Sequence, residues 1–268
     1  MMNSKRLSSC LAAMLLASPI ALADTIAKWT FETSPPAGTP GAGVWITNIV
    51  AEAGSGTASG LHAGAATYSS PVGNGSANSF SSTVWAAGDF YQFAVSTLGF
   101  QNLSVSFDIT KSATGPGTAA LQYSTDGSTF TQFGSSFLVL TNGTGFPSWN
   151  ATTAYSAYTM SFDLSSITVL NNASVVYFRV EAAAAPTSSS GTLRVDNILV
   201  SGASQVLPIP LNIQRVGTNV VLTWSDSAFA LQAAPNVTGT YTNIPGVANT
   251  NAYTEPIAGR QKFYRLMH

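Results

Sequence analysis

The sequence predicts an all-β protein whose first part is a two-sheet sandwich or jelly roll. Between residues 24 and 202, apolar and polar residues alternate with period two, which is typical of strands with one buried face. Clusters of Gly, Pro, Ser and Asn separate these segments at short intervals. The 268-residue chain is 45% hydrophobic but only 8% charged. It therefore has enough apolar residues to bury a core, while its surface stays nearly neutral.

Residues 1–23 have the pattern of a secretory signal peptide. Lys5 and Arg6 give a positive start, residues 11–22 are mostly apolar, and Ala-Leu-Ala at 21–23 is a small-x-small cleavage signal before Asp24. The apolar stretch contains a proline and is shorter than the roughly 20 residues needed to cross a bilayer. We therefore expect a secreted or cell-surface protein with no membrane insertion after cleavage.

The strongest alternation lies at residues 103–110, where every odd residue is apolar and every even residue is polar. Residues 160–164 and 176–181 repeat it, and each segment predicts a half-buried antiparallel strand. Asp126-Gly127 lies between two such segments and predicts a hairpin turn. We expect only a short helical turn near residues 164–170.

A second, smaller unit is expected after a linker. Residues 203–210 contain two prolines, which suit an extended connection. Residues 211–268 contain about five short apolar segments that predict strands. Because this unit has no disulfide and only about 60 residues, it lies near the lower size limit for independent folding.

Composition excludes several classes of function. One Cys and two His in the whole chain are too few for a Cys/His zinc site, an iron–sulfur cluster or a disulfide framework. With 10 basic and 11 acidic residues, the chain offers no basic stripe for phosphates, so nucleic acid is not an expected partner.

Two sets of motifs resemble known families. The segments at 91–96, 103–108, 114–117, 121–127 and 194–198 resemble secreted bacterial jelly-roll domains, of the concanavalin or carbohydrate-binding-module kind. Such domains occur in PEP-CTERM-sorted proteins and beside extracellular nucleases. Residues 211–268 resemble the fibronectin-III-like C-terminal module of verrucomicrobial secreted proteins. The resemblance implies a jelly-roll β-sandwich at 24–202 and a smaller β-sandwich at 211–268. No nuclease module and no Pro-Glu-Pro sorting motif follows in this sequence.

Glu32 and Asp196 are the candidate metal ligands. They lie on the first and last segments of the predicted sandwich, and the terminal strands of a jelly roll are commonly neighbours. Carboxylates with nearby carbonyl oxygens are the ligands that Ca²⁺ prefers, and the jelly-roll modules that this domain resembles have similar sites. The role expected for Ca²⁺ is structural. The alternative is a surface ion pair of Glu32 with Lys28 or Arg194.

Few residues suit catalysis. His62 is the only His inside the chain, so a Ser-His-Asp arrangement would depend entirely on it. We interpret it as a loop residue. Asp108 and Asp163 offer the two carboxylates of a glycosidase, although both also fit solvent-facing strand positions or a pairing with Arg179. An atypical polysaccharide hydrolase or lyase is accordingly a third hypothesis.

Binding is the leading hypothesis. Trp45, Trp85 and Trp149 lie beside Gly/Ser/Thr/Asn-rich stretches, where an exposed indole face would stack on a sugar ring; the alternative is core packing. We predict a non-catalytic binding or adhesion protein for extracellular polysaccharide or a cell-envelope component. The second hypothesis is a structural cell-surface or matrix protein that is anchored through its C-terminal module.

Overall fold

The computed structural model describes residues 23–205, 208–258 and 261–268 of the chain. They divide into two units, one ending at Ser204 and one starting at Gln205. The regular secondary structure of both units is almost wholly antiparallel strand, which confirms the predicted all-β fold. The predicted signal peptide lies outside the described residues apart from Ala23. Within the described part, no helix is long and apolar enough to span a membrane.

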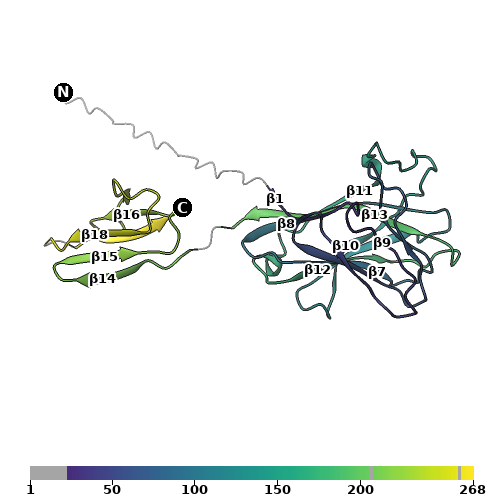
Figure 1. Ribbon diagram of the computed structural model, residues 1–268, viewed down its shortest axis with the longest axis horizontal. Helices are drawn as coiled ribbons and strands as arrows, with labels where there is room; N and C mark the ends of the chain where they lie inside the picture. Colours follow the sequence, from purple (N-terminus) through teal and green to yellow (C-terminus); the bar gives the residue numbers. More distant parts are fainter. Residues whose placement is uncertain (1–22, 206–207, 259–260) are drawn as a thin grey trace, which may run out of the picture. The chain divides into compact units, whose positions relative to one another are not determined.

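The first unit is a sandwich of two antiparallel sheets, the two layers in the larger part of Figure 1. The strands of the seven-stranded sheet are β1 (Ala23–Trp29), β3 (Ala53–Gly54), β5 (Tyr68–Ser69), β6 (Phe80–Ser82), β8 (Phe100–Lys111), β11 (Thr159–Asp163) and β13 (Leu193–Ser204). Their order is β11-β8-β13-β1-β3, with β6 also paired to β13 and β5 to β6.

The six-stranded sheet forms the other layer. Its strands are β2 (Ile46–Val50), β4 (Gly56–Leu61), β7 (Phe90–Val95), β9 (Thr118–Ser124), β10 (Thr131–Leu138) and β12 (Val176–Ala182). They are arranged in the order β10-β9-β12-β7-β4-β2. This order joins strands that are far apart in the sequence, so the face of this sheet combines residues from most of the unit.

The core lies between the two sheets and follows from the alternation. In β12 every second side chain is buried, starting from Val176, and the residues between them are partly exposed. Rings from the two layers meet in the interior, where Trp29 of β1 contacts Phe93 of β7 at a centroid distance of 5.2 Å. Full burial of such side chains stabilises the fold by roughly 1.5–3 kcal/mol each.

Strand β13 changes partner along its length. It pairs with β6 from Leu193 to Val195 and with β1 from Ile198 onward, so the terminal strands are neighbours as predicted. Between these stretches its register with β8 shifts at Asp196–Leu199, and Asn197 has a φ of 49°. Such a bulge re-aims side chains, and here it directs Asp196 and Asn197 at the loop between β5 and β6.

Local predictions are confirmed at two places. β9 and β10 form the expected hairpin, with Tyr123 opposite Thr131. Gly127 has a φ of 72° in its turn, and Asp126 Oδ1 accepts the backbone N–H groups of Ser128 and Thr129, both at 2.8 Å. The expected short helical turn is the 3₁₀ segment η2 (Thr168–Leu170); a second one, η1 (Ser156–Tyr158), precedes β11.

The second unit contains two three-stranded antiparallel sheets. One has the order β14 (Asn212–Val216), β15 (Asn219–Thr223), β18 (Ala252–Pro256), and the other has the order β17 (Thr242–Asn243), β16 (Ala230–Ala234), β19 (Phe263–Met267). Its small core is formed by Leu222, Trp224, Phe229, Leu231 and Val247. The sequence pattern missed β18. The fibronectin-III-like assignment stays a prediction.

The predicted linker 203–210 is shorter in the structure than the sequence indicates. Strand β13 continues to Ser204, and Ile209 packs against the core of the second unit. Both ends of the predicted linker therefore belong to folded units. Residues 206–207 lie outside the described residues.

Candidate functional site

Five side chains form a straight row across the outer face of the six-stranded sheet. Ser59 of β4 is opposite Gln92 of β7, which is opposite Arg179 of β12. Arg179 is opposite Gln122 of β9, which is opposite Gln132 of β10. Directly opposite residues of antiparallel strands point to the same face. These five residues, which we call the polar row, therefore share the solvent side of the sheet.

Aromatic rings enclose the centre of the polar row. The guanidinium carbon of Arg179 lies 3.6 Å from the centroid of Phe90 and 3.4 Å from that of Phe130. Trp45 in turn contacts Phe90 edge-on at 5.4 Å. We call these four residues the aromatic–guanidinium stack. Cation–π contacts on both faces hold the guanidinium in a fixed plane.

The charge of Arg179 is only partly compensated. Its Nε donates to Gln92 Oε1 at 2.9 Å. Burial lowers the pKa of Arg179 to about 10, and the negative charge of Glu181 acts in the opposite direction, so the side chain remains a cation at neutral pH. Glu181 itself accepts a hydrogen bond from Gln122 Nε2 at 2.6 Å. Among the described residues, Arg179 forms no ion pair, and its Nη atoms donate no hydrogen bond.

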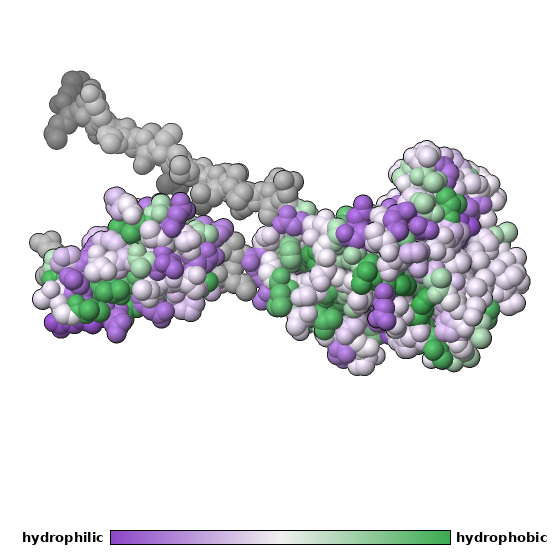
Figure 2. Space-filling view, viewed as in Figure 1, coloured by the Kyte–Doolittle hydropathy of each residue, from purple (hydrophilic) through white to green (hydrophobic). Residues whose placement is uncertain are grey.

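A hollow of about 380 Å³ lies beside the polar row on the same sheet. Thr57 and Ala94 line it, each two residues along its strand from Ser59 or Gln92. The outer face therefore offers hydrogen-bonding groups, exposed aromatic surface and a depression side by side. Figure 2 shows that the visible face of the larger unit is mostly near-neutral in hydropathy, with small scattered hydrophobic and hydrophilic patches.

The second unit holds a larger hollow of about 980 Å³ between its sheets. Its charged groups are already paired, because Lys262 Nζ lies 2.6 Å from Glu255 Oε2 and Tyr253 Oη donates to the same carboxylate at 2.9 Å. Prolines and tyrosines form much of the remaining lining. In the polar row, the Nη groups of Arg179 donate no hydrogen bond among the described residues. The outer face of the six-stranded sheet is therefore the better candidate site.

The three tryptophans that the sequence predicts as ligand-binding residues differ in exposure. Trp45 is 38% exposed and belongs to the aromatic–guanidinium stack. Trp85 is only 5% exposed and donates from Nε1 to Ser82 O at 2.9 Å. Trp149 is 3% exposed and packs against Tyr158 at 5.8 Å. The prediction of a stacking surface is therefore wrong for Trp85 and Trp149, because neither buried ring presents a face to a ligand.

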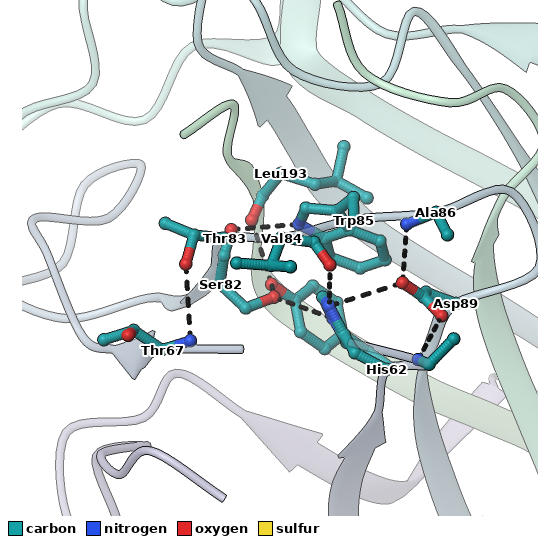
Figure 3. A network of polar contacts seen from close by, with 11 residues as sticks. His62, Thr67, Ser82, Thr83, Val84, Trp85, Ala86, Asp89 and Leu193 are labelled. Carbon is teal, nitrogen blue, oxygen red and sulfur yellow. Dashed lines mark hydrogen bonds and ion pairs between the residues drawn. The ribbon is translucent and has the colours of Figure 1, made fainter. Parts of the chain in front are cut away.

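His62 takes part in a buried network that connects Ser82 and Asp89 (Figure 3). His62 Nε2 lies 3.1 Å from Ser82 Oγ, and Nδ1 lies 3.5 Å from Asp89 Oδ2 and 3.2 Å from the carbonyl oxygen of Val84. The connectivity is that of a Ser-His-Asp triad. Burial, the largest cause, lowers the pKa of His62, although Val84 and Asp89 act against it.

Accessibility argues against catalysis by this network. Ser82, His62 and Asp89 are all buried, and Trp85 covers the imidazole with its ring at 4.2 Å. The Ser82 hydroxyl also lies 2.7 Å from Tyr91 Oη, which donates to the carbonyl oxygen of Leu193 at 2.9 Å. A nucleophile needs room for a substrate, and these partners occupy it. We therefore interpret this network, called the His62 array below, as one that stabilises the fold.

The carboxylates Glu32 and Asp196 both bind the loop between β5 and β6. Glu32 Oε1 accepts the backbone N–H of Asn78 at 2.8 Å. Asp196 Oδ2 accepts the N–H of Asn74 at 2.8 Å and the hydroxyl of Ser76 at 2.5 Å. The alternative ion pair of Glu32 with Lys28 or Arg194 is not found within the described ranges. The structure therefore brings both predicted ligands to one loop, where they hold different residues.

Asp108 joins the same polar cluster from β8. It is opposite Asp196 in the register of β8 and β13, and its Oδ2 accepts from Asn74 Nδ2 at 2.9 Å and from Asn197 Nδ2 at 2.8 Å. Burial, the main cause, raises the pKa of Asp196 to about 7, and the charge of Asp108 adds to the rise. Two carboxylates in this setting repel each other unless a proton or a cation compensates them.

Three oxygen atoms pack closely around Gly73 in this loop. A Cβ at this position would collide with Ser76 Oγ, the carbonyl oxygen of Asn78 and Asp196 Oδ2. Carboxylate, hydroxyl and carbonyl oxygens are the atom types that Ca²⁺ prefers, and here Ser76 Oγ donates to the other two oxygens. Across residues 23–205, 208–258 and 261–268, no three His, Cys, Asp or Glu side chains gather as a metal site. A cation here would therefore depend partly on hydroxyl and carbonyl oxygens.

The predicted glycosidase pair does not form. Asp108 is buried and bonded as described above, whereas Asp163 is exposed and accepts the N–H of Ser165 at 2.9 Å. On neighbouring strands, Asp163 is opposite Ser104 and Asp108 is opposite Thr159. This register offsets the two carboxylates by four residues along the strands, or roughly 13 Å, and one of them is inaccessible.

Comparisons with known proteins give no family. No family model matches the chain, and no curated protein matches it. Among solved structures, it is similar to the CBM22-1 xylan-binding domain of Xyn10C from Paenibacillus barcinonensis, with 11% identity over 70% of this chain and 99% of that chain and a TM-score of 0.39. It is also similar to the tandem CBM22 domains of the same protein, with 10% identity over 94% and 86% of the chains and a TM-score of 0.40.

A third similar structure is the K3 cleaved adhesin domain of Lys-gingipain from Porphyromonas gingivalis. It has 14% identity over 67% of this chain and 100% of that chain, with a TM-score of 0.34. Likenesses at this level carry no functional argument. The sorting signal, the nuclease association and the C-terminal module inferred from the sequence stay predictions.

Sequence reasoning missed most of the polar row and of its stack. The alternating segment 176–181 places Tyr177, Arg179 and Glu181 on the outer face, and this signal was visible in the sequence. Which strands flank β12 was not visible, because β7 and β9 are 50 or more residues away. Without the register, Gln92 and Gln122 are only two polar positions among many.

Proposed function

We propose that this protein is an exported, non-catalytic binding module for extracellular polysaccharide. The observation that carries the proposal is the in-register polar row beside the aromatic–guanidinium stack on one open sheet face. Amide and guanidinium groups offer donors and acceptors to sugar hydroxyls, and Trp45 offers an exposed ring edge and face for apolar sugar surface. The low charge of the chain, 8%, is compatible with recognition through hydrogen bonds and aromatic contacts.

A polysaccharide panel tests this proposal. Mature protein from Asp24 onward is run in native gels that contain xylan, β-glucan, mannan or polygalacturonate, and retardation is measured. We expect at least one polymer to retard it, and Trp45→Ala to weaken binding about tenfold. Val169→Ala, which removes an exposed apolar side chain elsewhere, is the matched control. No retardation by any polymer, or unchanged binding by Trp45→Ala, contradicts the proposal.

Export and the absence of catalysis are tested separately. N-terminal sequencing of secreted protein is expected to begin at Asp24, and reducing-end release from a bound polymer is expected to stay at background. Cell-associated protein that is lost on deletion of residues 205–268 would instead favour the structural, envelope-anchored alternative.

We also propose that Ca²⁺ stabilises the loop between β5 and β6, held by oxygens of Asp196, Ser76 and Asn78 with Glu32 supporting the loop. The ion would compensate the carboxylates of Asp196 and Asp108. We expect Ca²⁺ to raise the melting temperature of the sandwich relative to a chelator, and Asp196→Asn to remove this increase. Equal melting temperatures in Ca²⁺ and chelator contradict the proposal.

A further inference from the structure

Arg179 has more donors than its surroundings use. A guanidinium carries five N–H groups in one plane, and Nε–H to Gln92 is the one hydrogen bond found for it in the described part of the chain. The rings of Phe90 and Phe130 stack against the planar guanidinium group. A ligand atom therefore reaches Arg179 within the guanidinium plane, at the edge formed by its N–H groups.

The groups around Arg179 compensate its charge only in part, because the negative charge of Glu181 acts on it without forming an ion pair. The directly opposite residues on both neighbouring strands, Gln92 and Gln122, are neutral amides. Glu181 is the acidic residue on the same face of β12, and its carboxylate is bonded to Gln122 and forms no ion pair with Arg179. Burial already disfavours the charged guanidinium. A partly desolvated cation of this kind gains most from an anion that meets it with paired oxygens.

We propose that the polysaccharide bound by this face is acidic, and that Arg179 binds the carboxylate of a uronic-acid residue through two parallel N–H···O bonds. This inference rests on the proposed function and names its ligand class. The planar carboxylate matches the in-plane fork of the guanidinium. Because Phe90 and Phe130 already fix the plane, little side-chain freedom is lost when the ligand binds. The neutral members of the polar row then serve the hydroxyl groups of the sugar.

The test compares two polymers whose uronic-acid groups are either free carboxylates or neutral methyl esters. Binding of the full mature protein to polygalacturonate and to its methyl-esterified form is measured by calorimetry, in the presence of a chelator so that Ca²⁺ does not cross-link the polymer. We expect at least tenfold tighter binding to the free acid, and this preference is expected to shrink as salt is added. Equal affinity for the two polymers overturns the proposal.

Variants of Arg179 locate the effect. Arg179→Met is expected to reduce affinity for polygalacturonate at least tenfold and affinity for the ester much less, so that the preference for the free acid disappears. Arg179→Lys keeps the charge without the fork and is expected to lose about fivefold. Arg215→Met removes an exposed Arg from the second unit and serves as the control. Unchanged polygalacturonate binding by Arg179→Met overturns the proposal.

Three further results are decisive. Tighter binding to a sulfated polysaccharide than to polygalacturonate overturns the carboxylate assignment in favour of a tetrahedral oxyanion. Binding to neutral polymers that Trp45→Ala weakens, without any preference for the free acid, overturns this inference and leaves the proposed function intact. Failure to bind any polysaccharide contradicts the proposed function itself. Unfolding curves of each variant confirm that the sandwich is folded.

Discussion

The His62 array and the aromatic–guanidinium stack are built from similar parts and lie in the same sandwich. Each places one basic side chain among aromatic rings with an acidic residue nearby. Around His62 both ring nitrogens have partners, and the whole group is buried. Around Arg179 most N–H donors have no protein partner, and the group lies on an open sheet face. The two groups differ in how many of their hydrogen-bonding atoms have protein partners and in whether solvent reaches them. These differences, and not the residue types, separate a structural network from a candidate binding site.

This contrast corrects what residue types alone suggest. Ser, His and Asp in contact are typical of a hydrolase, yet here they are closed off from any substrate. Gln and Arg at alternate strand positions attract little notice in a sequence, yet the register aligns them in one row. Each prediction below tests whether one side of the contrast is structural and the other is functional.

The largest effect is expected for Asp89→Ala. Asp89 accepts the backbone N–H groups of Ala63 at 2.8 Å and Ala86 at 2.6 Å, and it faces His62. Its removal leaves these donors without a partner in a buried place, so the free energy of unfolding should fall by about 2–4 kcal/mol. Calorimetry of the sandwich transition measures this. Asp163→Ala removes an exposed carboxylate and should leave the transition unchanged. Equal losses of unfolding free energy in both variants would contradict a special structural role for the group around His62.

A smaller loss of stability is expected for Gly73→Ala. The added Cβ would collide with two oxygens of the loop and with Asp196 Oδ2, which holds the loop, so the loop must shift, at a cost of about 1–3 kcal/mol. Gly117 has open space around its Cβ position, and Gly117→Ala should change the free energy of unfolding by less than about 0.5 kcal/mol. Chemical denaturation compares the two. Similar values for both variants would show that the loop adapts freely.

The pH dependence of stability tests the His62 array. Burial lowers the pKa of His62 in the folded protein, so below about pH 6.5 the unfolded chain takes up a proton that the folded chain does not. The contribution of His62 to stability therefore falls as the pH falls through this region, whereas Asp196, whose pKa burial raises to about 7 in the folded protein, contributes in the opposite direction. His62→Gln should lack this component, and His268→Gln should retain it. Parallel pH profiles for wild type and His62→Gln would contradict a buried neutral His62.

The smallest stability effect is expected for Arg179→Met. Its partly exposed cation–π contacts contribute roughly 0.5–1 kcal/mol each, and the Met side chain retains part of the packing. The net loss in the free energy of unfolding should be about 0.5 kcal/mol, although polysaccharide affinity falls strongly. A large loss of stability, comparable with that of Asp89→Ala, would assign Arg179 to the fold instead of the ligand.

Much of the fold follows from local sequence signals. Alternation at 103–110 and 176–181 predicted β8 and β12, and Asp126-Gly127 predicted the β9–β10 turn, because side-chain period and turn geometry are local properties. Strand β18 escaped prediction, since Ala252–Pro256 offers little apolar alternation. The linker was predicted too long because the two prolines indicate extended chain, and not where packing ends.

The site was far less predictable. A tryptophan beside polar residues indicates a loop, but not whether the loop folds back onto the protein, so Trp45 was exposed while Trp85 and Trp149 were buried. The polar row depends on the register between strands that are distant in sequence, which no local pattern encodes. Asp108 lies beside Asp196 because the register of β8 and β13 sets the two residues opposite each other, which no local pattern encodes.

The aromatic–guanidinium stack draws its members from four separate stretches of chain, which precede β2, lie in β7, precede β10 and lie in β12. A chain that is still emerging and has not reached β12 therefore lacks part of this stack. Under the function proposed above, capture of a polymer would begin only after the chain through β12 has been made and folded.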